Sequence, residues 1–496
     1  MNLQALFCNQ IPATRLPSME IALITQSSRD ATPNSLFVCI RGAVANGHRY
    51  AADAYARGCR AFVAEEPLEL PDDAVVVNVP DTRQALALLA ARFYGEPSKK
   101  LRVIGITGTK GKTTTAHLIA HLCNSAKIPC GYIGTNGISF ANNHTETKNT
   151  TPDPLTLQKM LAKMADCGMQ AVALEVSSQA LLQARADGIQ FEAVMFTNLS
   201  PDHIGVGEHT SFDDYKACKK RLFSDFSAKK AIFWQDDPCA CEMIAACKSQ
   251  TVVTCSAIDP DADYHLSNVR PKRNDTTLGI DFDICKAQRS VSCYLPLLGA
   301  FNAQNACLAV ALVKEIFDLP TASLALSLRS ARVPGRAEQL PIPSGACVCI
   351  DYAHNAFSLQ ALLVALRQYQ PRRLTVLFGS VGGRTQIRRR EMGAIAAKYA
   401  DYAILTSDNP ACEAPEEIIA DIAKGFGKRT DAYVSIPDRK KALLWALKDA
   451  KAGDILVLAG KGHENYQLIG NEKIPFCERT IVEDYIATTK QKETVL

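Results

Sequence analysis

The sequence predicts an α/β fold divided into three domains. The chain has 496 residues, which is too long for a single hydrophobic core. From residue 101 onward, short apolar runs alternate with segments of helical periodicity, which is typical of a mostly parallel sheet with right-handed crossovers. A glycine-rich turn at residues 105–115 joins one apolar run to a helical pattern, so the central domain carries a candidate phosphate-binding loop.

The first domain is expected over residues 1–97. Its strands are predicted at residues 35–40, 61–64 and 74–78, with helical or turn-rich segments between them. A charged, turn-forming stretch at residues 95–100 separates this domain from the next.

The central domain is expected over residues 98–332. Its strands are predicted at residues 101–107, 130–135, 171–176, 193–199, 231–234 and 252–255. Residues 263–296 change to period-two alternation, which predicts a small antiparallel addition, and a helix is predicted over 302–317. The third domain, residues 333–496, repeats the α/β alternation. Its strands are predicted at residues 348–351, 374–379, 402–406, 433–436 and 455–459.

The composition is typical of a globular protein of the cytoplasm. Hydrophobic residues make up 47% of the chain, and the net charge of +4 is too small to indicate nucleic-acid binding. The 18 cysteines include no CxxC pair, so free thiols in a reducing cytosol explain them better than disulfides or zinc. Because no leader and no membrane-spanning apolar run is recognised, the protein is expected in the cytoplasm without membrane insertion.

The candidate phosphate loop is expected to bind a nucleotide. Its residues are Gly108, Thr109, Lys110, Gly111, Lys112, Thr113 and Thr114. Backbone N–H groups at the start of the following helix would face the anion, Lys112 would add a point charge, and Thr113 could ligate magnesium. The common phosphate-loop pattern has glycine where this chain has Ile106. A glycine-rich turn without function is the alternative, and the combination of Gly, Lys and Thr between strand and helix argues against it.

Polar residues follow two further predicted strands of the central domain. Glu175 and His203 would lie at the carboxyl edge of the parallel sheet, beside the phosphate loop. They are suited to holding a magnesium ion that one loop threonine cannot hold alone. The alternative for each is a capping role at the surface.

Nine motifs, in the same order along the chain, resemble those of the Mur ligase family. They occupy residues 105–113 (GITGTKGKT), 149–154 (NTTPDP), 175–178 (EVSS), 198–203 (NLSPDH), 298–305 (LGAFNAQN), 334–338 (PGRAE), 351–355 (DYAHN), 408–410 (DNP) and 460–464 (GKGHE). The resemblance covers nearly the whole chain. It implies three domains, with a phosphate-loop ATPase domain in the centre and a Rossmann-like domain at the C-terminus.

The resemblance also implies a reaction. Members of the family are ligases of peptidoglycan synthesis that use ATP and Mg²⁺ to form an acyl phosphate, which an incoming amine attacks. The motifs at 408–410 and 460–464 point to the branch that adds the third residue of the peptide. The expected partners are therefore UDP-N-acetylmuramoyl-L-alanyl-D-glutamate and a free amino acid.

Site residues of the ATPase reaction are carried over from the family motifs. The implied catalytic residues are Lys112, Glu175, His203, Lys219 and Arg336. The implied metal ligands are Thr113, Glu175, His203 and Lys219. Lys219 corresponds to a lysine that the family carbamylates to bind a second magnesium ion, and an exposed helical lysine is the alternative. Arg336 is expected on the phosphates, His354 near the nucleotide and Asn302 on the adenine, although Asn302 could instead cap a helix.

The resemblance assigns two further groups of residues to the substrates. The UDP-linked substrate is expected to contact Ser28, Gly42, Asn149, Thr150, Thr151, Ser177, Gln183 and Arg185. Arg185 would pair with a carboxylate or phosphate through its planar fork. The third amino acid is expected to contact Arg384, Asp408, Asn409, Ala411, Gly460 and Glu464.

The identity of the third amino acid depends on Ala411. Family members that add meso-diaminopimelate generally have arginine after Asp-Asn-Pro, whereas alanine offers no charge to a distal carboxylate. L-Lysine is therefore favoured, with Asp408 and Glu464 on its ammonium groups and Asn409 orienting its chain. Ornithine, another diamino acid and diaminopimelate remain open, because Arg384 could still reach a carboxylate.

Two other functions remain open. A ligase similar to folylpolyglutamate synthase would share the ATP machinery, but not the combination of motifs at 149–154, 408–410 and 460–464. A non-catalytic protein gated by ATP is disfavoured by the presence of Lys112, Glu175, His203 and Lys219. The protein is expected to be a monomer and to bind no nucleic acid.

Overall fold

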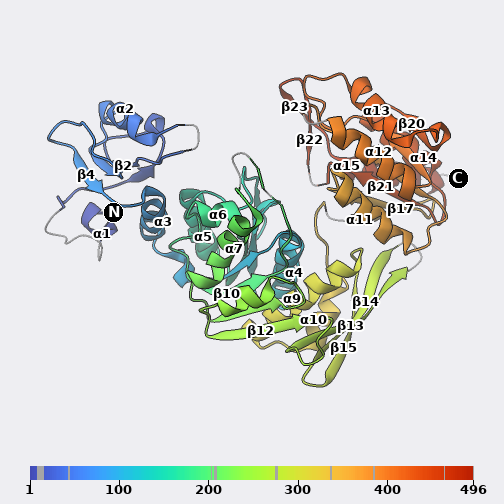
Figure 1. The fold of residues 1–496 in the computed structure, drawn as a ribbon, viewed down its shortest axis with the longest axis horizontal. Coiled ribbons are helices and arrows are strands. Elements are labelled where there is room, and N and C mark those ends of the chain that lie inside the picture. The colour runs from blue at the N-terminus through green and yellow to red at the C-terminus, as the bar shows by residue number, and fades with distance from the viewer. Residues whose placement is uncertain are drawn as a thin grey trace. The chain divides into compact units, whose positions relative to one another are not determined.

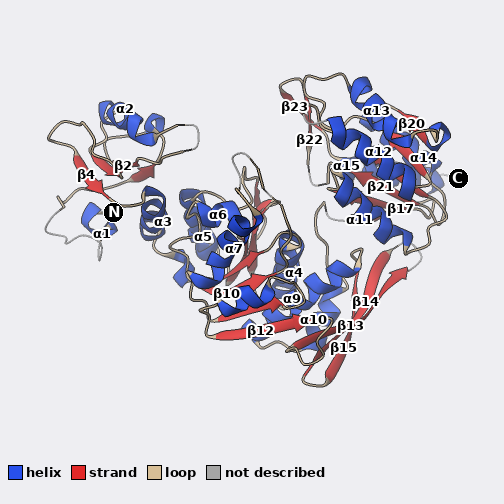
Figure 2. Cartoon of the chain, in the orientation of Figure 1, coloured by secondary structure: helices blue, strands red, loops and turns tan. Residues whose placement is uncertain are grey.

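The computed structural model describes residues 1–7, 16–42, 45–202, 204–205, 209–273, 277–335, 338–383, 386–462 and 464–494. The chain divides into two compact units, each with hydrophobic core clusters of its own. Unit 1 comprises Met1–Asp263 and Leu308–Leu319, and unit 2 comprises Tyr264–Cys307 and Pro320–Leu496. Figure 1 labels the elements along the chain, and Figure 2 shows helices lying along the sheets in both units.

The N-terminal part of unit 1 contains a parallel sheet in the order β1-β2-β3-β4. Its strands are β1 (Leu23–Thr25), β2 (Ser35–Val38), β3 (Ala61–Ala64) and β4 (Val75–Asn78), and the accompanying helices are α1 (Leu3–Leu6), α2 (Ala51–Ala56) and α3 (Thr82–Phe93). β3 is apolar and buried at every position, as expected of a strand covered on both faces. Helix α3 begins after Asp81, because the Asp81 carboxylate accepts from the N–H groups of Arg83 and Gln84.

The remainder of unit 1 is built on a sheet in the order β12-β11-β10-β5-β9-β6-β7-β8. Strands β12 through β6 are parallel, and β7 and β8 are added antiparallel. The strands are β5 (Arg102–Thr107), β6 (Cys130–Gly134), β7 (Gly137–Phe140), β8 (Asn143–Thr145), β9 (Ala171–Glu175), β10 (Phe191–Phe196), β11 (Lys230–Trp234) and β12 (Thr251–Ser256). The helices are α4 (Lys112–Ser125), α5 (Pro154–Asp166), α6 (Ser178–Leu182), α7 (Phe212–Ser224) and α8 (Ala240–Ala245).

The carboxyl ends of three adjacent strands bring the candidate ATP site together. β5 lies between β9 and β10. The register pairs Ile106 with Glu175 and Thr107 with Phe196, so the loop after β5 starts beside the ends of both neighbours. Open parallel sheets bind their ligands at this edge.

Unit 2 contains an antiparallel ladder and a second, mostly parallel sheet. The ladder consists of β13 (Tyr264–Arg273), β14 (Leu278–Lys286) and β15 (Arg289–Leu295). The sheet has the order β16-β17-β21-β18-β19-β20, in which only β16 is antiparallel to its neighbour. Its strands are β16 (Glu338–Pro341), β17 (Cys347–Asp351), β18 (Leu374–Phe378), β19 (Tyr402–Leu405), β20 (Tyr433–Ser435) and β21 (Ile455–Ala459).

Helices and one hairpin complete unit 2. The helices are α10 (Thr321–Leu328), α11 (Ala356–Arg367), α12 (Gln386–Tyr399), α13 (Pro415–Ala423), α14 (Arg439–Asp449) and α15 (Glu478–Thr494). Helix α9 (Ala300–Phe317) begins in unit 2 and ends in unit 1. The hairpin consists of β22 (Tyr466–Ile469) and β23 (Glu472–Pro475). Short 3-10 helices occupy Ser28–Asp30, Gly47–Tyr50, Pro97–Lys99, Lys424–Phe426 and Thr430–Ala432.

The α/β fold and the strands predicted from the sequence are confirmed, with ends shifted by a few residues. The antiparallel addition predicted near residues 263–296 is confirmed as β13–β15. Strands β1, β7, β8, β16 and the β22–β23 hairpin were not predicted. The three domain boundaries stay a prediction. No described helix combines the length and the apolar character that a membrane crossing requires.

Candidate active site

The loop after β5 follows a path that requires glycine at position 108. Gly108 has a φ of +148°, and a Cβ there would lie 2.0 Å from Thr197 Oγ1 and 2.9 Å from the Asn198 carbonyl oxygen. The side chain of Asn198 holds the loop from both sides, because its Oδ1 accepts from the Lys110 N–H at 2.9 Å and its Nδ2 donates to the Lys110 carbonyl at 3.0 Å. Helix α4 begins directly after the loop, at Lys112, so the loop leads into a helix N-terminus suited to phosphate.

Two lysine side chains converge on one carbonyl of this loop. Lys112 Nζ donates to the Gly108 carbonyl at 2.8 Å, and Lys219 Nζ donates to the same oxygen at 2.9 Å. Lys219 lies on α7, is only 1% exposed, and packs over the ring of Tyr215. Burial, and then the charge of Lys112, hold the pKa of Lys219 well below its usual value. The alternative of an exposed helical lysine at position 219 is therefore wrong.

Glu175 is fully buried at the end of β9 and accepts several hydrogen bonds. Tyr132 donates its hydroxyl at 2.6 Å, the Thr135 N–H donates at 3.0 Å, and Thr113 Oγ1 donates at 2.9 Å. A surface-capping role for Glu175 is therefore wrong. These bonds join Glu175 on β9 to Tyr132 on β6 and to Thr113 on α4.

The residues beside the loop fit a hard cation. Thr113 and Glu175 present a hydroxyl and a carboxylate oxygen 2.9 Å apart, and oxygen ligands of this kind suit Mg²⁺. His203, the third expected ligand, lies outside the described residues. Among the residues that are described, no group of three His, Cys, Asp or Glu side chains gathers as a complete metal site.

Four residues expected to bind the UDP-linked substrate form one connected cluster next to Glu175. Arg185 donates from Nη1 to the Thr151 carbonyl at 2.8 Å and from Nη2 to Gln183 Oε1 at 2.8 Å. Thr151 Oγ1 donates to the Glu175 carbonyl at 2.7 Å and accepts from the Ser177 N–H at 3.1 Å. The cluster thus links the expected substrate contacts to the strand that carries Glu175.

The other expected contacts of this substrate lie apart along the chain. Thr150 Oγ1 is 3.2 Å from Thr135 Oγ1, and Asn149 is exposed. Ser28 begins a 3-10 helix after β1, and the Gly42 N–H donates to the Ala45 carbonyl in a turn after β2. Their roles in binding stay predictions.

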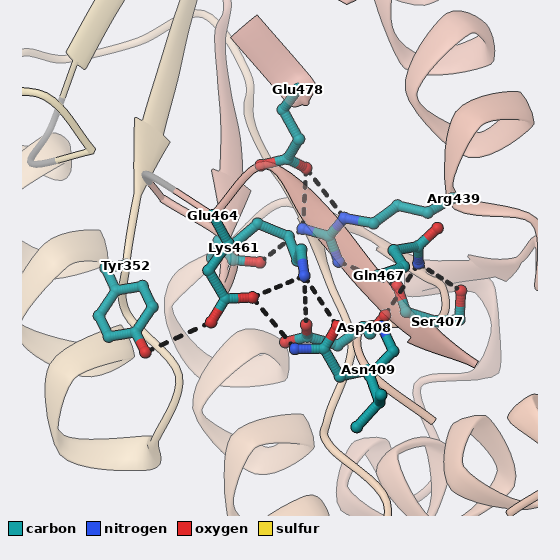
Figure 3. Close-up of polar contacts among 11 residues, drawn as sticks. Tyr352, Ser407, Asp408, Asn409, Arg439, Lys461, Glu464, Gln467 and Glu478 are labelled. Carbon is teal, nitrogen blue, oxygen red and sulfur yellow. Dashed lines mark hydrogen bonds and ion pairs between the residues drawn. The ribbon is translucent and has the colours of Figure 1, made fainter. Parts of the chain in front are cut away.

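Residues expected to bind the third amino acid gather in unit 2, in the loops that follow β19 and β21, called the amino-acid loops. Figure 3 shows Lys461 reaching between Asn409 and Glu464. Lys461 Nζ lies 2.6 Å from Glu464 Oε2, 2.9 Å from Asn409 Oδ1 and 3.7 Å from Asp408 Oδ1. The carboxylates expected to hold a substrate ammonium group therefore already contact an ammonium group of the protein.

Ala411 is held by strand β22. Its φ is +52°, its N–H donates to the Leu468 carbonyl at 3.0 Å, and its carbonyl accepts from the Gly470 N–H at 2.8 Å. Asn409 Oδ1 also accepts from the Leu468 N–H at 2.9 Å. The β22–β23 hairpin thus fixes the backbone at the position on which amino-acid choice was expected to depend.

Two residues expected near the nucleotide are engaged within unit 2. Asn302 is buried in the first turn of α9, where its Nδ2 donates to the Leu298 carbonyl at 2.7 Å. A helix cap would accept from backbone N–H groups of the first turn, but Asn302 Oδ1 instead accepts from Asn305 Nδ2 at 3.0 Å, so no capping bond is seen in the described part of the chain. Its role at the adenine stays a prediction. His354 Nδ1 donates to the Tyr352 carbonyl at 2.8 Å. Arg336 and Arg384 lie outside the described residues.

Several residues at the two sites were missed by sequence reasoning. Tyr132 lies in the buried strand β6, and its sequence context predicts an ordinary core residue. Nothing in the sequence therefore indicates that its hydroxyl bonds to Glu175. Lys461 lies within the motif at 460–464, which could have signalled it. Arg439 and Glu478 lie outside all nine motifs.

Comparison with known proteins gives a consistent result. Family models described as Mur ligase family, catalytic domain; Mur ligase middle domain; and Mur ligase, glutamate ligase domain match residues 20–94, 106–313 and 335–462. A UDP-N-acetylmuramoyl-L-alanyl-D-glutamate--2,6-diaminopimelate ligase from Geobacillus thermodenitrificans is 36% identical over 471 residues, covering 93% of this chain and 94% of the relative.

Solved structures agree with the sequence relatives. A structure of a UDP-N-acetylmuramoyl-L-alanyl-D-glutamate--2,6-diaminopimelate ligase matches with a TM-score of 0.74 and 30% identity, covering 99% of both chains. Folylpolyglutamate synthase from Mycobacterium tuberculosis, complexed with ADP, matches with a TM-score of 0.58 and 18% identity, covering 76% of this chain and 91% of that one. The second likeness shows a shared fold alone.

Proposed function

The chain belongs to the Mur ligase family and is an ATP-dependent ligase, and we propose that it adds L-lysine as the third residue to UDP-N-acetylmuramoyl-L-alanyl-D-glutamate. The family models match segments along most of the chain, which include the phosphate loop, Glu175, Lys219, Asp408, Asn409 and Lys461. The observation that carries the choice of lysine is Ala411, because alanine follows Asp-Asn-Pro at the position where a charged partner for a second carboxylate is expected.

In the proposed reaction, the terminal carboxylate of the UDP-linked dipeptide accepts the γ-phosphoryl group of ATP. The amine of the third amino acid then attacks the acyl phosphate, loses a proton and displaces phosphate. Lys112 and the start of α4 would hold the nucleotide phosphates. Thr113 and Glu175 would hold Mg²⁺, which supplies charge neutralisation on the transferred group.

Lys219 is proposed to carry a carbamate in the active protein. Carbon dioxide adds to a neutral amine, and the lowered pKa of Lys219 favours that form. The product has anionic oxygens, which are suitable ligands for a hard cation. The anionic carbamate, formed with loss of a proton from nitrogen, would attract the neighbouring ammonium group of Lys112, whereas a protonated Lys219 would repel it.

The charges of unit 2 support a substrate without a second carboxylate. Three described cations in or beside the amino-acid loops are each paired with a carboxylate. Lys461 pairs with Glu464, Arg439 with Glu478, and Arg389 with Glu413 and Asp421. Asp408 and Glu464 together carry one more negative charge than Lys461 neutralises. This surplus favours one additional ammonium group, as lysine brings on its side chain.

meso-Diaminopimelate is the second candidate for the third amino acid. The relative from Geobacillus thermodenitrificans and the 30% identical solved structure are both named as diaminopimelate ligases. A distal carboxylate would then need Arg384 as its partner, since Ala411 offers none.

We also propose three domains with boundaries at residues 1–97, 98–332 and 333–496, a monomeric state and a cytoplasmic location. The three separate family-model matches support the division. The cytoplasmic location is supported by cysteines that, among the described residues, are all free thiols.

Phosphate release tests the proposal. The protein is incubated with UDP-N-acetylmuramoyl-L-alanyl-D-glutamate, ATP and Mg²⁺, and with L-lysine, L-ornithine or meso-diaminopimelate in turn. Release that depends on lysine supports the proposal. Release with diaminopimelate alone replaces lysine by the second candidate, and no release with any amino acid refutes the proposed ligation.

A further inference from the structure

A buried ion pair outside every motif lies behind the amino-acid loops. Arg439 on α14 and Glu478 at the start of α15 are each 1% exposed, and Arg439 Nε donates to Glu478 Oε1 at 2.9 Å. Figure 3 shows the Glu478 carboxylate facing the guanidinium group of Arg439. None of the catalytic or binding roles described above uses this pair.

The guanidinium group of Arg439 also contacts both strand ends. Its Nη1 donates to the Ser407 carbonyl at 3.1 Å, and its Nη2 donates to the Ala459 carbonyl at 2.8 Å. Ser407 immediately precedes Asp408, and Ala459 is the last residue of β21. In the sheet, β18 lies between β19 and β21, so the two loops start from strands that are not neighbours. One planar group therefore links the starting points of both loops.

Gln467 of β22 holds the same segment from a different element. Its Nε2 donates to the Asp408 carbonyl at 2.8 Å and to Ser407 Oγ at 3.2 Å. The segment from Ser407 to Asp408 is thus fixed by α14 and by β22. Because Lys461 bridges from the second loop to Asn409, a shift of either loop would change the cluster that faces the amino acid.

The pair is not explained by stability alone. Burial raises the pKa of Glu478 even though Arg439 opposes the rise, and the second carboxylate oxygen, Oε2, is buried without a hydrogen-bond partner. Apolar residues of similar volume often replace a buried ion pair without loss of stability. They cannot supply the two bonds from Arg439 to the Ser407 and Ala459 carbonyls.

We propose that Arg439 and Glu478 are positioning residues for the amino-acid site. Glu478 orients the guanidinium group, and the guanidinium group sets the spacing between the two amino-acid loops. Helix α15 thereby contributes to amino-acid selection through its first residue. The inference rests on the proposed function, since the affected substrate is the amino acid of that reaction.

Steady-state kinetics of the full chain test this proposal with two variants. Arg439→Lys keeps the charge but not the planar fork. The double variant Arg439→Met/Glu478→Met removes the ion pair without leaving an unpaired buried charge. The control for position along the strands is Arg372→Met/Asp454→Met. Arg372 is half-exposed and makes a two-pronged bond to the buried Asp454, at 2.8 and 2.7 Å, just before β18 and β21, at the opposite ends of these strands.

We expect the KM for the amino acid used by the wild type to rise about tenfold in both Arg439 variants, equivalent to about 1.4 kcal/mol. The KM values for ATP and for the UDP-linked substrate should not change. The double variant should keep the melting temperature of the wild type, which separates a loss of position from a loss of stability. The control should not change the KM for the amino acid.

Either of two results overturns the proposal. The first is an unchanged amino-acid KM in both Arg439 variants of an active protein. The second is an equal rise in the Arg372 and Asp454 control. A wild-type protein that ligates no amino acid refutes the proposed function itself, and the inference with it, so the two failures are distinguishable.

Discussion

Gly108 shows how a single residue shapes the phosphate loop. A Cβ at this position would collide with Thr197 Oγ1 and approach the backbone of Asn198, and the φ of +148° is unfavourable for alanine. We expect Gly108→Ala to lower the rate of phosphate release about 100-fold, since displacement of a catalytic group by 1 Å has effects of that size. Gly168→Ala is the control, because Gly168 also has a positive φ but no atom within 4 Å of an added Cβ. Equal loss in both variants would contradict the steric argument.

Lys219 allows a direct test of its proposed carbamate. Lys219→Ala should depress phosphate release, and small carboxylates such as acetate should restore part of it by supplying the missing oxygen ligands. Lys220→Ala is the matched control on the same helix, since Lys220 pairs with Glu242 at 2.9 Å away from the loop. A fully active Lys219→Ala protein would show that the role belongs to another residue.

Ala411 tests amino-acid selection at one side chain. Ala411→Arg should raise the efficiency of ligation with meso-diaminopimelate relative to L-lysine, because a guanidinium group can pair with the distal carboxylate. The ratio of kcat/KM for the two amino acids is the measurement. An unchanged ratio would mean that position 411 does not contact the side chain of the substrate.

At the scale of single residues, sequence reasoning succeeded where chemistry and motif coincide. Lys112, Glu175 and Lys219 were placed together because each is polar and lies within a recognisable pattern, and the structure brings them to one loop. Arg439 could not be selected in this way. Arg439 is followed by two lysines, and three adjacent cations are typical of a solvated helix face. Only the structure shows that Arg439 is buried.

At the scale of elements, β6 supports the end of β9 through Tyr132. The Tyr132 hydroxyl donates to Glu175 and accepts from the Asn136 N–H at 3.1 Å. Tyr132→Phe removes one hydrogen-bond partner from the Glu175 carboxylate and one from the Asn136 N–H. Loss of a partner lowers the free energy of unfolding by about 1–3 kcal/mol for a buried group. We expect a lower melting temperature and a higher Mg²⁺ concentration for half-maximal phosphate release.

Tyr264→Phe provides the comparison for Tyr132. Tyr264 is a buried tyrosine of unit 2 whose hydroxyl accepts from Lys286 at 2.9 Å. Its substitution should lower the melting temperature without changing the Mg²⁺ dependence. A Tyr132→Phe protein with the Mg²⁺ dependence of the wild type would contradict the support of Glu175 by β6.

Buried parallel strands were the elements most readily predicted. β9, β18 and β21 are buried at every position, and their continuous apolar runs are visible in the sequence. The β22–β23 hairpin was not predicted, because β23 is exposed throughout and has no apolar pattern. The hairpin nevertheless positions two residues of the proposed amino-acid site, since β22 bonds to Asn409 and Ala411.

At the scale of the whole molecule, we expect substrate binding and carboxylate activation to depend on different residues. Lys112→Ala should abolish phosphate release, because it removes the loop cation that would face the phosphates. Binding of the UDP-linked substrate, measured by calorimetry, should remain, since the Thr151–Arg185 cluster does not include Lys112. Wild-type turnover in this variant, or loss of substrate binding together with turnover, would contradict this separation.

The sequence predicted three successive domains, which stay a prediction, and it gave no sign of the two compact units of the structure. Helix α9 is one continuous segment that the contacts divide between two units. Residues 264–307 belong to unit 2, although the sequence prediction assigned them to the central domain. A linear pattern of strands and helices gives no information on contacts made by segments distant in sequence, which explains the difference.

The backbone at Ala411 has a consequence for how such proteins diversify. Both polar groups of its peptide backbone are bonded to the β22 region, and alanine, lysine and arginine there bear a similar left-handed cost of about 1–2 kcal/mol. The path of the loop is therefore independent of the side chain that occupies the position. If position 411 selects the amino acid, as we propose, a lineage can exchange one diamino acid of its cell wall for another by changing this codon, and the fold is inherited intact.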